Sequence, residues 1–217
     1  MRYRAVIFDL WQTLVPWDVL AATRFYDQMA VAAGVDEERF REAWVTRRKD
    51  REVGPIADHL RDLFAELGAE PDLDEILDMR RDWTKRSLQP RPDAISTLES
   101  LRERGHRLGL ITVCSEDVPN VWEETPFAER FDATVFSCSE GVAKPDRRIY
   151  ELACERLGVE PGDCIFVGDG ANDELPGAER VGMTALQLRA PGEPLTPEGE
   201  TWAGASIEHL SEVLDLT

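Results

Sequence analysis

Short apolar runs separated by helix-length segments are the feature that most constrains the fold of this chain. The first run, residues 5–8 (Ala-Val-Ile-Phe), is too short for a helix and is rich in β-branched and aromatic residues, as strands buried on both faces are. Strands that alternate with helices pair in parallel and carry helices on both faces of their sheet. We therefore predict an α/β fold built on a parallel sheet. The predicted strands are residues 5–8, 107–112, 133–137, 164–168 and 183–188.

Helical segments fill the intervals between these strands. Pro145 stands in the first turn of one segment, where a proline fits, and Gly158 follows directly after its end. Residues 190–204 are rich in proline and glycine and are predicted to form a loop. The predicted helices of this part of the chain are residues 93–104, 116–124, 145–157, 171–181 and 207–214.

Residues 16–90 show helical periodicity and no convincing strand, unlike the rest of the chain. Glycine or proline follows three of the helices predicted here, as is typical of helix ends. A block of helices that directly follows the first strand indicates an inserted α-helical subdomain. Residues 1–15 and 91–217 would then form the α/β core. The four predicted helices of the insert are residues 20–33, 36–47, 55–67 and 73–87.

The net charge of −18 limits the partners of the chain. With 43 acidic and 25 basic residues, no surface that neutralises phosphates is expected, which disfavours nucleic acid and anionic membranes as partners. No apolar run is long enough to span a bilayer. The chain enters its first strand directly after its first few residues, so we expect no secretory signal. The four cysteines show no C-x-x-C spacing, and we expect a cytoplasmic protein with reduced thiols.

Polar residues stand where four of the predicted strands end or connect to the next helix. Asp9 follows the first strand and Thr112 ends the second. Lys144 precedes the helix after the third strand, and Asp169, with Asp173, follows the fourth. Right-handed crossovers bring the carboxyl ends of parallel strands to one edge of the sheet, where open α/β sheets bind their ligands. We therefore expect these side chains to converge.

The converging residue types suit an aspartate nucleophile that works beside a metal ion. Carboxylates at this density repel one another unless a cation lies among them, and Mg²⁺ prefers a few carboxylates with backbone oxygens and water. Lysine adds a point charge suited to a phosphoryl oxygen. Each residue also has a plainer interpretation, because Asp9 could cap the next helix, Lys144 could open an ordinary helix and residues 168–170 could form a tight turn. Their ordered occurrence at strand ends favours the catalytic interpretation.

The sequence resembles the haloacid dehalogenase-like (HAD) hydrolase superfamily over nearly its whole length. Residues 6–14 (Val-Ile-Phe-Asp-Leu-Trp-Gln-Thr-Leu) are similar to the first motif of that family, and residues 110–112 to the second. Residues 141–150 are similar to the third motif and residues 166–178 to the fourth. The resemblance implies a Rossmann-like core, and it implies that residues 16–90 form a helical cap of the first type.

The resemblance also implies a metal site. Asp9 is implied to be both the nucleophile and a ligand of Mg²⁺, the implied cofactor. Asp169 and the backbone carbonyl of Trp11 are the other implied protein ligands, and Asp173 is implied to support the site. A backbone carbonyl can serve whatever the side chain at that position is.

The remaining implied roles concern the transferring group. Thr112 is implied to hydrogen-bond that group, and Lys144 to stabilise charge on the nucleophile and the substrate. With Asp9 and Asp173 they make up the implied catalytic residues. The implied activity is hydrolysis of a small phosphorylated metabolite, an anionic small molecule, by a chain for which a monomer and a homodimer both remain open.

Trp11 departs from the pattern of the family's phosphatases. These enzymes generally carry a second aspartate two residues after the nucleophile, which protonates the leaving group and then activates water. An indole donates one N–H and cannot deliver a proton at neutral pH. General acid–base catalysis is worth ~10²–10⁴-fold in rate. Either the leaving group needs little protonation, another residue supplies the proton, or turnover is slow enough for a regulatory role.

Two branches of the family that lack this acid give alternative functions. In 2-haloacid dehalogenases a halide leaves without a proton and Mg²⁺ is not used, but these enzymes lack an acidic fourth motif. Their cap presents an arginine near an aromatic residue, to which residues 40–45 offer a faint parallel, with Val45 where the arginine is expected. In phosphonate-cleaving hydrolases a cap lysine forms a Schiff base with the substrate. Lys49 lies in the right region, but its highly charged surroundings favour a solvated helix face.

Three arginines near that lysine, Arg47, Arg48 and Arg51, leave a further choice open. Guanidinium groups can recognise an anionic substrate through bidentate contacts. A charged run of this kind is more often a solvated helix face, so surface display is the favoured interpretation.

Overall fold

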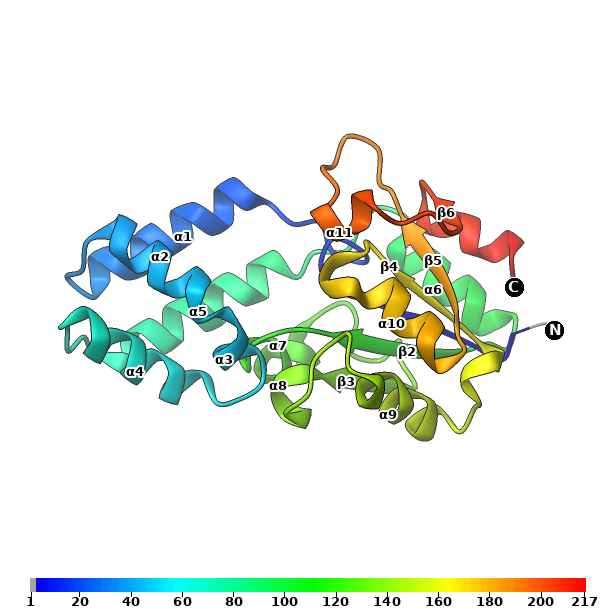
Figure 1. Cartoon of the computed structure of the whole chain (residues 1–217), viewed down its shortest axis with the longest axis horizontal. Helices are drawn as coiled ribbons and strands as arrows, with labels where there is room; N and C mark the ends of the chain where they lie inside the picture. The colour runs from blue at the N-terminus through cyan, green and yellow to red at the C-terminus, as the bar shows by residue number, and fades with distance from the viewer. Residues whose placement is uncertain (1–2) are drawn as a thin grey trace.

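The structure is a computed structural model that describes residues 3–217, and its centre is a six-stranded parallel sheet of order β3-β2-β1-β4-β5-β6 (Figure 1). The first strand lies in the middle of the sheet, paired with β2 on one side and β4 on the other. The predicted Rossmann-like α/β fold is confirmed, with one strand more than expected. The strands are β1 (Ala5–Phe8), β2 (Arg107–Thr112), β3 (Ala133–Phe136), β4 (Cys164–Gly168), β5 (Thr184–Leu188) and β6 (Ser206–Ile207).

The register of the central strands places the first polar residue at the carboxyl edge of the sheet. Phe8 pairs with Leu110 of β2 and Val167 of β4. The ladder extends one residue further, because the backbone N–H of Asp9 donates to the carbonyl of Val167 at 2.9 Å. Asp9 therefore leaves the sheet at a fixed position beside the end of β4.

Apolar residues of β1 alternate between two cores, one on each face of the sheet. Val6 and Phe8 pack on one side and Ala5 and Ile7 on the other, as the two-residue period of a strand requires. The first core lies against α6 (Ala94–Glu103) and α7 (Asp117–Val121), and the second against α9 (Arg147–Leu157) and α10 (Glu174–Val181). Helices thus cover both faces, as predicted.

A group of five helices extends away from the sheet, drawn in blue to cyan in Figure 1. Its members pack around a separate apolar core that includes Phe25, Phe40, Trp44, Leu60 and Phe64. No helix among residues 3–217 is both long and apolar enough to cross a membrane. The helices are α1 (Val19–Ala32), α2 (Glu37–Thr46), α3 (Arg48–Glu52), α4 (Ile56–Leu67) and α5 (Leu73–Ser87).

Four helices of this group agree with the sequence prediction, and each begins or ends where local chemistry requires. The side chains of Asp18, Asp36 and Asp72 accept hydrogen bonds from backbone N–H groups at the first turns of α1, α2 and α5. Gly68 ends α4 with a φ of 75°. The short helix α3 was not predicted, because its sequence Arg-Lys-Asp-Arg-Glu has no apolar periodicity to reveal it.

Arg91 joins the two chain segments that connect the helical group to the sheet. Its backbone N–H donates to the carbonyl of Leu14 at 2.9 Å. Its guanidinium donates to the carbonyls of Thr13 at 2.6 Å and Gln12 at 2.7 Å, and forms an ion pair with Glu193. This buried arginine therefore holds the loop that follows Asp9 in place.

The predicted helix over residues 207–214 is wrong at its start. Ile207 belongs to β6, and a 3₁₀ helix, η4 (Leu210–Asp215), follows it. The apolar residues Ile207, Leu210 and Val213 recur every three positions, a period that a 3₁₀ helix fits as well as an α-helix. Two other short helices, α8 (Ser137–Glu140) and α11 (Pro197–Glu200), were not predicted, and the second lies in the predicted loop.

The other short elements are 3₁₀ turns next to predicted strands or helices. They are η1 (Trp122–Glu124), η2 (Pro161–Asp163) and η3 (Ala171–Asp173). The first continues α7 and together they fill the predicted helix over residues 116–124. The third, η3, precedes α10 within the predicted helix over residues 171–181. This turn alters which side chain of the segment faces the candidate site.

Candidate functional site

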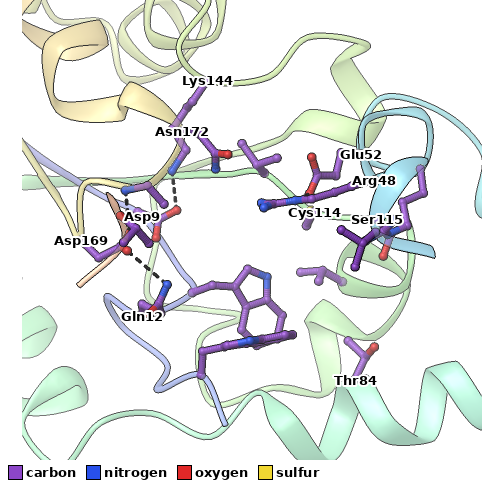
Figure 2. Close-up of a pocket in the computed structure, with 18 of the residues that line it drawn as sticks. Asp9, Gln12, Arg48, Glu52, Thr84, Cys114, Ser115, Lys144, Asp169 and Asn172 are labelled. Atoms are coloured by element: carbon purple, nitrogen blue, oxygen red, sulfur yellow. Dashed lines mark hydrogen bonds and ion pairs between the residues drawn. The ribbon is translucent and has the colours of Figure 1, made fainter. Parts of the chain in front are cut away.

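Lys144 lies at the centre of a buried group of charges at the carboxyl edge of the sheet (Figure 2). Its Nζ donates to Asp9 Oδ1 at 2.5 Å and forms an ion pair with Glu174, and the three side chains are at most 7% exposed. Burial favours the neutral amine, but the carboxylates of Asp9 and Glu174 outweigh it and raise the pKa of Lys144 above its ordinary value. Lys144 is therefore a fixed positive charge next to the predicted nucleophile.

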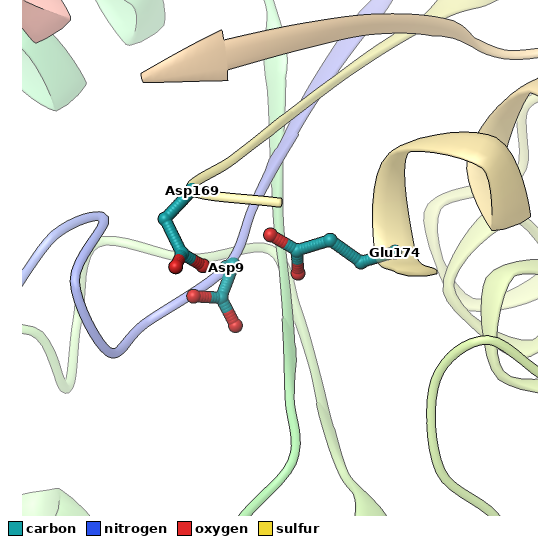
Figure 3. Close-up of side chains that lie close together, drawn as sticks. All are labelled: Asp9, Asp169 and Glu174. Carbon is teal, nitrogen blue, oxygen red and sulfur yellow. The ribbon is translucent and has the colours of Figure 1, made fainter. Parts of the chain in front are cut away.

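Three carboxyl groups, which we call the acid cluster, converge beside this lysine. One oxygen from each of Asp9, Asp169 and Glu174 lies within 4.8 Å of the others, and all three residues are buried (Figure 3). Burial, with repulsion from Asp9, raises the pKa of Asp169 to about 6. Burial likewise raises the pKa of Glu174. One lysine faces three acids here, and carboxylate oxygens are the donors that Mg²⁺ prefers. The residues therefore fit a hard divalent cation.

Two glycines at the end of β4 allow Glu174 to reach the acid cluster. A Cβ atom on Gly168 would lie 2.1 Å from Glu174 Oε1, so a side chain there would displace the carboxylate of Glu174. The N–H of Gly170 donates to the same oxygen at 2.9 Å, and Gly170 has a φ of 102°, which only glycine adopts readily. The Gly-Asp-Gly sequence thus forms a cradle for the carboxylate of Glu174.

Asp169 is oriented from both sides of the sheet edge. Gln12 Nε2 donates to Asp169 Oδ2 at 3.2 Å, and the N–H of Ala171 donates to Oδ1 at 3.3 Å. The carbonyl of Asp169 accepts from Gln187 Nε2 of β5 at 2.9 Å. These contacts hold the Asp169 side chain toward Asp9, as the strand-end pattern predicted.

The structure does not bring Asp173 to the acid cluster, and the neighbouring Glu174 takes that place. Asp173 is exposed, with a φ of 51°, whereas Glu174 is 1% exposed. Glu174 precedes Gly177 and Ala178 by three and four residues, so it shares the buried face of α10 with them. That helical spacing was readable from the sequence and would have selected Glu174. The prediction was therefore one residue out of register.

Thr112 and Trp11 lie next to the acid cluster in different ways. Thr112 is fully buried at the end of β2, and its Oγ1 has no hydrogen-bond partner among the described residues. The indole of Trp11 lines the cavity described below and packs edge-on against Trp17, with ring centroids 5.1 Å apart. The roles of the Thr112 hydroxyl and of the Trp11 carbonyl remain predictions.

A cavity of about 360 Å³ lies between the acid cluster and the helical group. Four aromatic residues, which we call the aromatic wall, join Trp11 in lining it, three of them on α1, α2 and α5 and the fourth in the segment just before α1. Ring contacts link them, since Trp17 lies 5.8 Å from Trp83 and Tyr26 lies 5.6 Å from Trp44. The cavity is thus charged at the sheet and mainly aromatic at the helices. The aromatic wall consists of Trp17, Tyr26, Trp44 and Trp83.

Two of the three arginines considered from the sequence line this cavity, contrary to the favoured interpretation of surface display. They are Arg48 and Arg51, which lie three residues apart on one face of α3. Figure 2 shows Arg48 and its ion-pair partner Glu52 across the cavity from Lys144. Arg47 lies outside it, paired with surface acids, and Lys49 is exposed. The arginines that face the cavity could not be predicted, because the sequence did not reveal the helix α3.

The similarity to known proteins extends over the sheet and the helical group. A family model described as haloacid dehalogenase-like hydrolase matches residues 3–182. The chain is 32% identical to the glyceraldehyde 3-phosphate phosphatase of Methanopyrus kandleri over 199 residues, which are 86% of this chain and 84% of that enzyme. It is 34% identical to (S)-2-haloacid dehalogenase 4A of Burkholderia cepacia over 119 residues, which are 53% of this chain and 49% of that enzyme.

A solved structure gives the same picture at the level of the fold. A HAD phosphatase from Thermococcus onnurineus superposes on the chain with a TM-score of 0.71. The two chains are 27% identical, and the match covers 98% of this chain and 97% of that one. Phosphatases and a dehalogenase therefore share this fold with the chain.

Proposed function

This chain belongs to the haloacid dehalogenase-like hydrolase family, and from that premise we propose that it is a Mg²⁺-dependent phosphatase of small phosphorylated metabolites. The observation that carries the proposal is the acid cluster with Lys144 at its centre. Halide release from carbon needs a nucleophile but no group of acids to hold a cation. The phosphatase that is similar over most of the chain supports the same choice.

The proposed reaction uses Asp9 as the nucleophile. Lys144 hydrogen-bonds Asp9 Oδ1, so the other oxygen, Oδ2, attacks the phosphorus atom. The bond from phosphorus to the ester oxygen breaks, the leaving group takes the electron pair, and Asp9 becomes an acyl phosphate. Water then attacks the phosphorus atom, which restores the carboxylate of Asp9 and releases inorganic phosphate and a proton to solvent. Lys144 stabilises the negative charge on the phosphoryl oxygens throughout.

The residues at the sheet edge would hold Mg²⁺ during this reaction. Asp9, Asp169 and the backbone carbonyl of Trp11 are its proposed protein ligands, with Glu174 in place of Asp173 as the supporting acid. When bound, the ion supplies positive charge that offsets repulsion between the carboxylates and the phosphate. Thr112 is proposed to hydrogen-bond the transferring phosphoryl group.

Among the described residues, the cavity offers no free carboxylic acid to protonate the leaving group in place of the aspartate that Trp11 replaces. Among the described residues that line it, the one carboxylate outside the acid cluster is Glu52, and Arg48 holds Glu52 in an ion pair. We therefore propose that the substrate has a weakly basic leaving group, as in aryl, enol or acyl phosphates. Such a leaving group departs without a general acid.

We further propose that residues 16–90 act as a cap over the core formed by residues 1–15 and 91–217. The separate apolar core of the helical group supports this division, and closure of a cap excludes water from phosphoryl transfer. The four cysteines are free, which supports a reducing compartment such as the cytoplasm. The proposed substrate is a small anion, and a monomer and a homodimer remain the proposed assembly states.

The test is hydrolysis of a panel of phosphate esters with and without Mg²⁺. The proposal requires activity that chelation removes and that Asp9→Asn abolishes, whereas Asp173→Asn, a change at an exposed acid of similar type, leaves it unaltered. Absence of activity on every ester, or activity that survives Asp9→Asn, would reject the proposal.

Trp11 favours dehalogenation of short 2-haloacids as the second candidate function, because a halide needs no proton. Halide release that persists after chelation would support it and would replace the phosphatase proposal. A metal-binding regulatory protein without turnover is the third candidate. It requires that beryllium fluoride binds at Asp9 while no phosphate ester is hydrolysed.

A further inference from the structure

Two arginines lie against the ring of Trp44 in the aromatic wall, and they differ in how their charge is balanced. The Cζ atoms of Arg51 and Arg80 lie 4.1 and 4.6 Å from the ring centroid. Arg80 forms two hydrogen bonds to the carboxylate of Asp117 and a third to Ser115. Arg80 is therefore a neutralised structural cation that connects α5 to α7.

Arg51 has no such carboxylate. Its one hydrogen bond among the described residues runs from Nη1 to the backbone carbonyl of Trp44, at 2.5 Å. The two acids next to it in sequence, Asp50 and Glu52, form ion pairs with Arg47 and Arg48. Four of the five guanidinium N–H donors of Arg51 are therefore without a described partner.

Arg51 is nevertheless buried, with a relative exposure of 9%, and what it exposes faces the cavity. Burial, with repulsion from Arg80, lowers the pKa of Arg51 to about 10, so the group remains charged at neutral pH. A buried charge that no ion pair balances is costly, and an anionic ligand would supply the opposite charge.

Aromatic side chains line the cavity between Arg51 and the acid cluster. Trp11 and Trp17 line it near the sheet, and Trp83 and Tyr26 continue the surface toward Trp44. Flat apolar groups pack well against such rings. A volume of about 360 Å³ suits a small ligand rather than a polymer.

We infer that Arg51 forms an anion subsite at the helical end of the cavity, which binds a second oxyanion on the phosphate ester that Asp9 attacks. This inference rests on the proposed phosphatase function and narrows its substrate class. The substrate is a small phosphate monoester with a flat apolar body that carries a carboxylate or a second phosphate at the end away from the reacting phosphorus. The planar guanidinium matches either oxyanion through paired N–H donors.

The test compares matched aryl phosphates that differ at the far end of the ring. 4-Carboxyphenyl phosphate and 4-carbamoylphenyl phosphate have nearly the same shape, but the second is neutral at that end, and 1,4-phenylene bisphosphate carries a second phosphate there. We expect kcat/KM to be about 10- to 100-fold higher for the carboxylate than for the amide, as a hydrogen-bonded charge pair contributes. Comparison of kcat/KM for the bisphosphate and for the carboxylate ester shows which of the two oxyanions the subsite prefers.

Arg51→Gln should reduce the ratio of carboxylate to amide to about one. Arg47→Gln is the matched control, because Arg47 lies in the same charged run but outside the cavity, and it should keep the full ratio. Arg51→Lys keeps the charge and should keep part of the ratio, which provides a second variant if Arg51→Gln folds poorly.

Binding measured without turnover keeps this inference separate from the proposed function. Binding to Asp9→Asn is measured by the fluorescence of the tryptophans that line the cavity. The carboxylate ester should have a lower dissociation constant than the amide ester. If no ester is hydrolysed by the native chain but binding still discriminates through Arg51, the function fails and the anion subsite stands. Equal binding and equal kcat/KM for the carboxylate, amide and bisphosphate esters, or a ratio unaltered in Arg51→Gln, would overturn the subsite.

Discussion

The acid cluster and the aromatic wall enclose one cavity, but they are held in place by different forces. Asp9, Asp169 and Lys144 leave the ends of paired strands or the loops beside them, and hydrogen bonds to backbone and side chains fix their direction. Three residues of the aromatic wall lie on helices that pack through ring contacts and an apolar core, and Trp17 lies in the segment just before α1. We infer that the sheet edge carries the chemistry and that the helical side sets the choice of substrate.

Lys144→Met should have the largest effect, because it removes the positive charge on which the sheet edge depends. We expect kcat to fall about 10²–10³-fold, as when one group that stabilises transition-state charge is lost. The metal-free protein should also lose about 3–5 kcal/mol of stability, because two buried carboxylates lose their partner. Steady-state kinetics and chemical denaturation measure the two effects. Lys85→Met, at a half-exposed lysine of α5, is the control and should change neither.

Glu174→Gln should weaken Mg²⁺ binding about 10- to 100-fold, the usual cost of removing an acid that supports a metal site. The physical reason is the loss of one of three negative charges within the acid cluster. The midpoint of a Mg²⁺ titration, followed by thermal stability, measures the change. Asp173→Asn is the matched control with an expected shift near zero. A larger effect from Asp173→Asn than from Glu174→Gln would restore the original assignment of Asp173.

Trp11→Asp should raise activity on alkyl phosphates by about tenfold or more, because it supplies the missing general acid where leaving groups are strongly basic. Aryl phosphates should gain much less, since their leaving groups need little protonation. The ratio of kcat/KM values for ethyl and phenyl phosphate, in the native chain and in the variant, measures this difference. An unchanged ratio would mean that another group already protonates the leaving group.

A fall in pH should change the stability contributed by the acid cluster and by the helical group in opposite directions. The pKa of Asp169 is raised to about 6, whereas the pKa of an unfolded aspartate is about 4. As the pH falls from about 6 to 4, the folded protein binds this proton more tightly than the unfolded chain does, so Asp169 makes the metal-free protein gain stability. Burial, with repulsion from Arg51, lowers the pKa of His59 in the helical group to about 4. Unfolded histidine binds a proton near pH 6.5, so His59 makes the protein lose stability as the pH falls from about 6.5 toward 4.

This histidine effect should amount to about 2 kcal/mol at pH 4.5. Thermal unfolding of the native chain and of His59→Leu between pH 7 and 4.5 measures it, and the variant should lose less stability than the native chain on acidification. Parallel curves for the native chain and His59→Leu would contradict a neutral buried His59.

The sheet and the strand-end residues could be predicted from sequence because their positions follow from local rules. An apolar run that ends in Asp9 or Asp169 places the carboxylate at the sheet edge whatever surrounds it. Glu174 was within reach of the same reasoning through its helical spacing to Ala178. The start of η4 was not, because Ile207, Leu210 and Val213 satisfy two helical periods at once.

The helical side of the cavity could not be predicted in the same way. Arg47, Arg48 and Arg51 look alike in sequence, and the face that each presents depends on α3, a five-residue helix without apolar periodicity. That Arg51 lacks a carboxylate while Arg80 has Asp117 depends on contacts across 37 residues of chain. Such pairings are set by tertiary packing, which sequence periodicity does not encode.

The most direct test of the central claim is to trap the phosphorylated enzyme. The native chain is mixed with phenyl phosphate and Mg²⁺, quenched in acid within one turnover and digested for mass spectrometry. The account predicts one phosphoryl group on the peptide that contains Asp9, formed with Mg²⁺ and absent after chelation or in Asp9→Asn. Hydrolysis that proceeds with no phosphorylated peptide, or with the phosphoryl group on a residue other than Asp9, would contradict it.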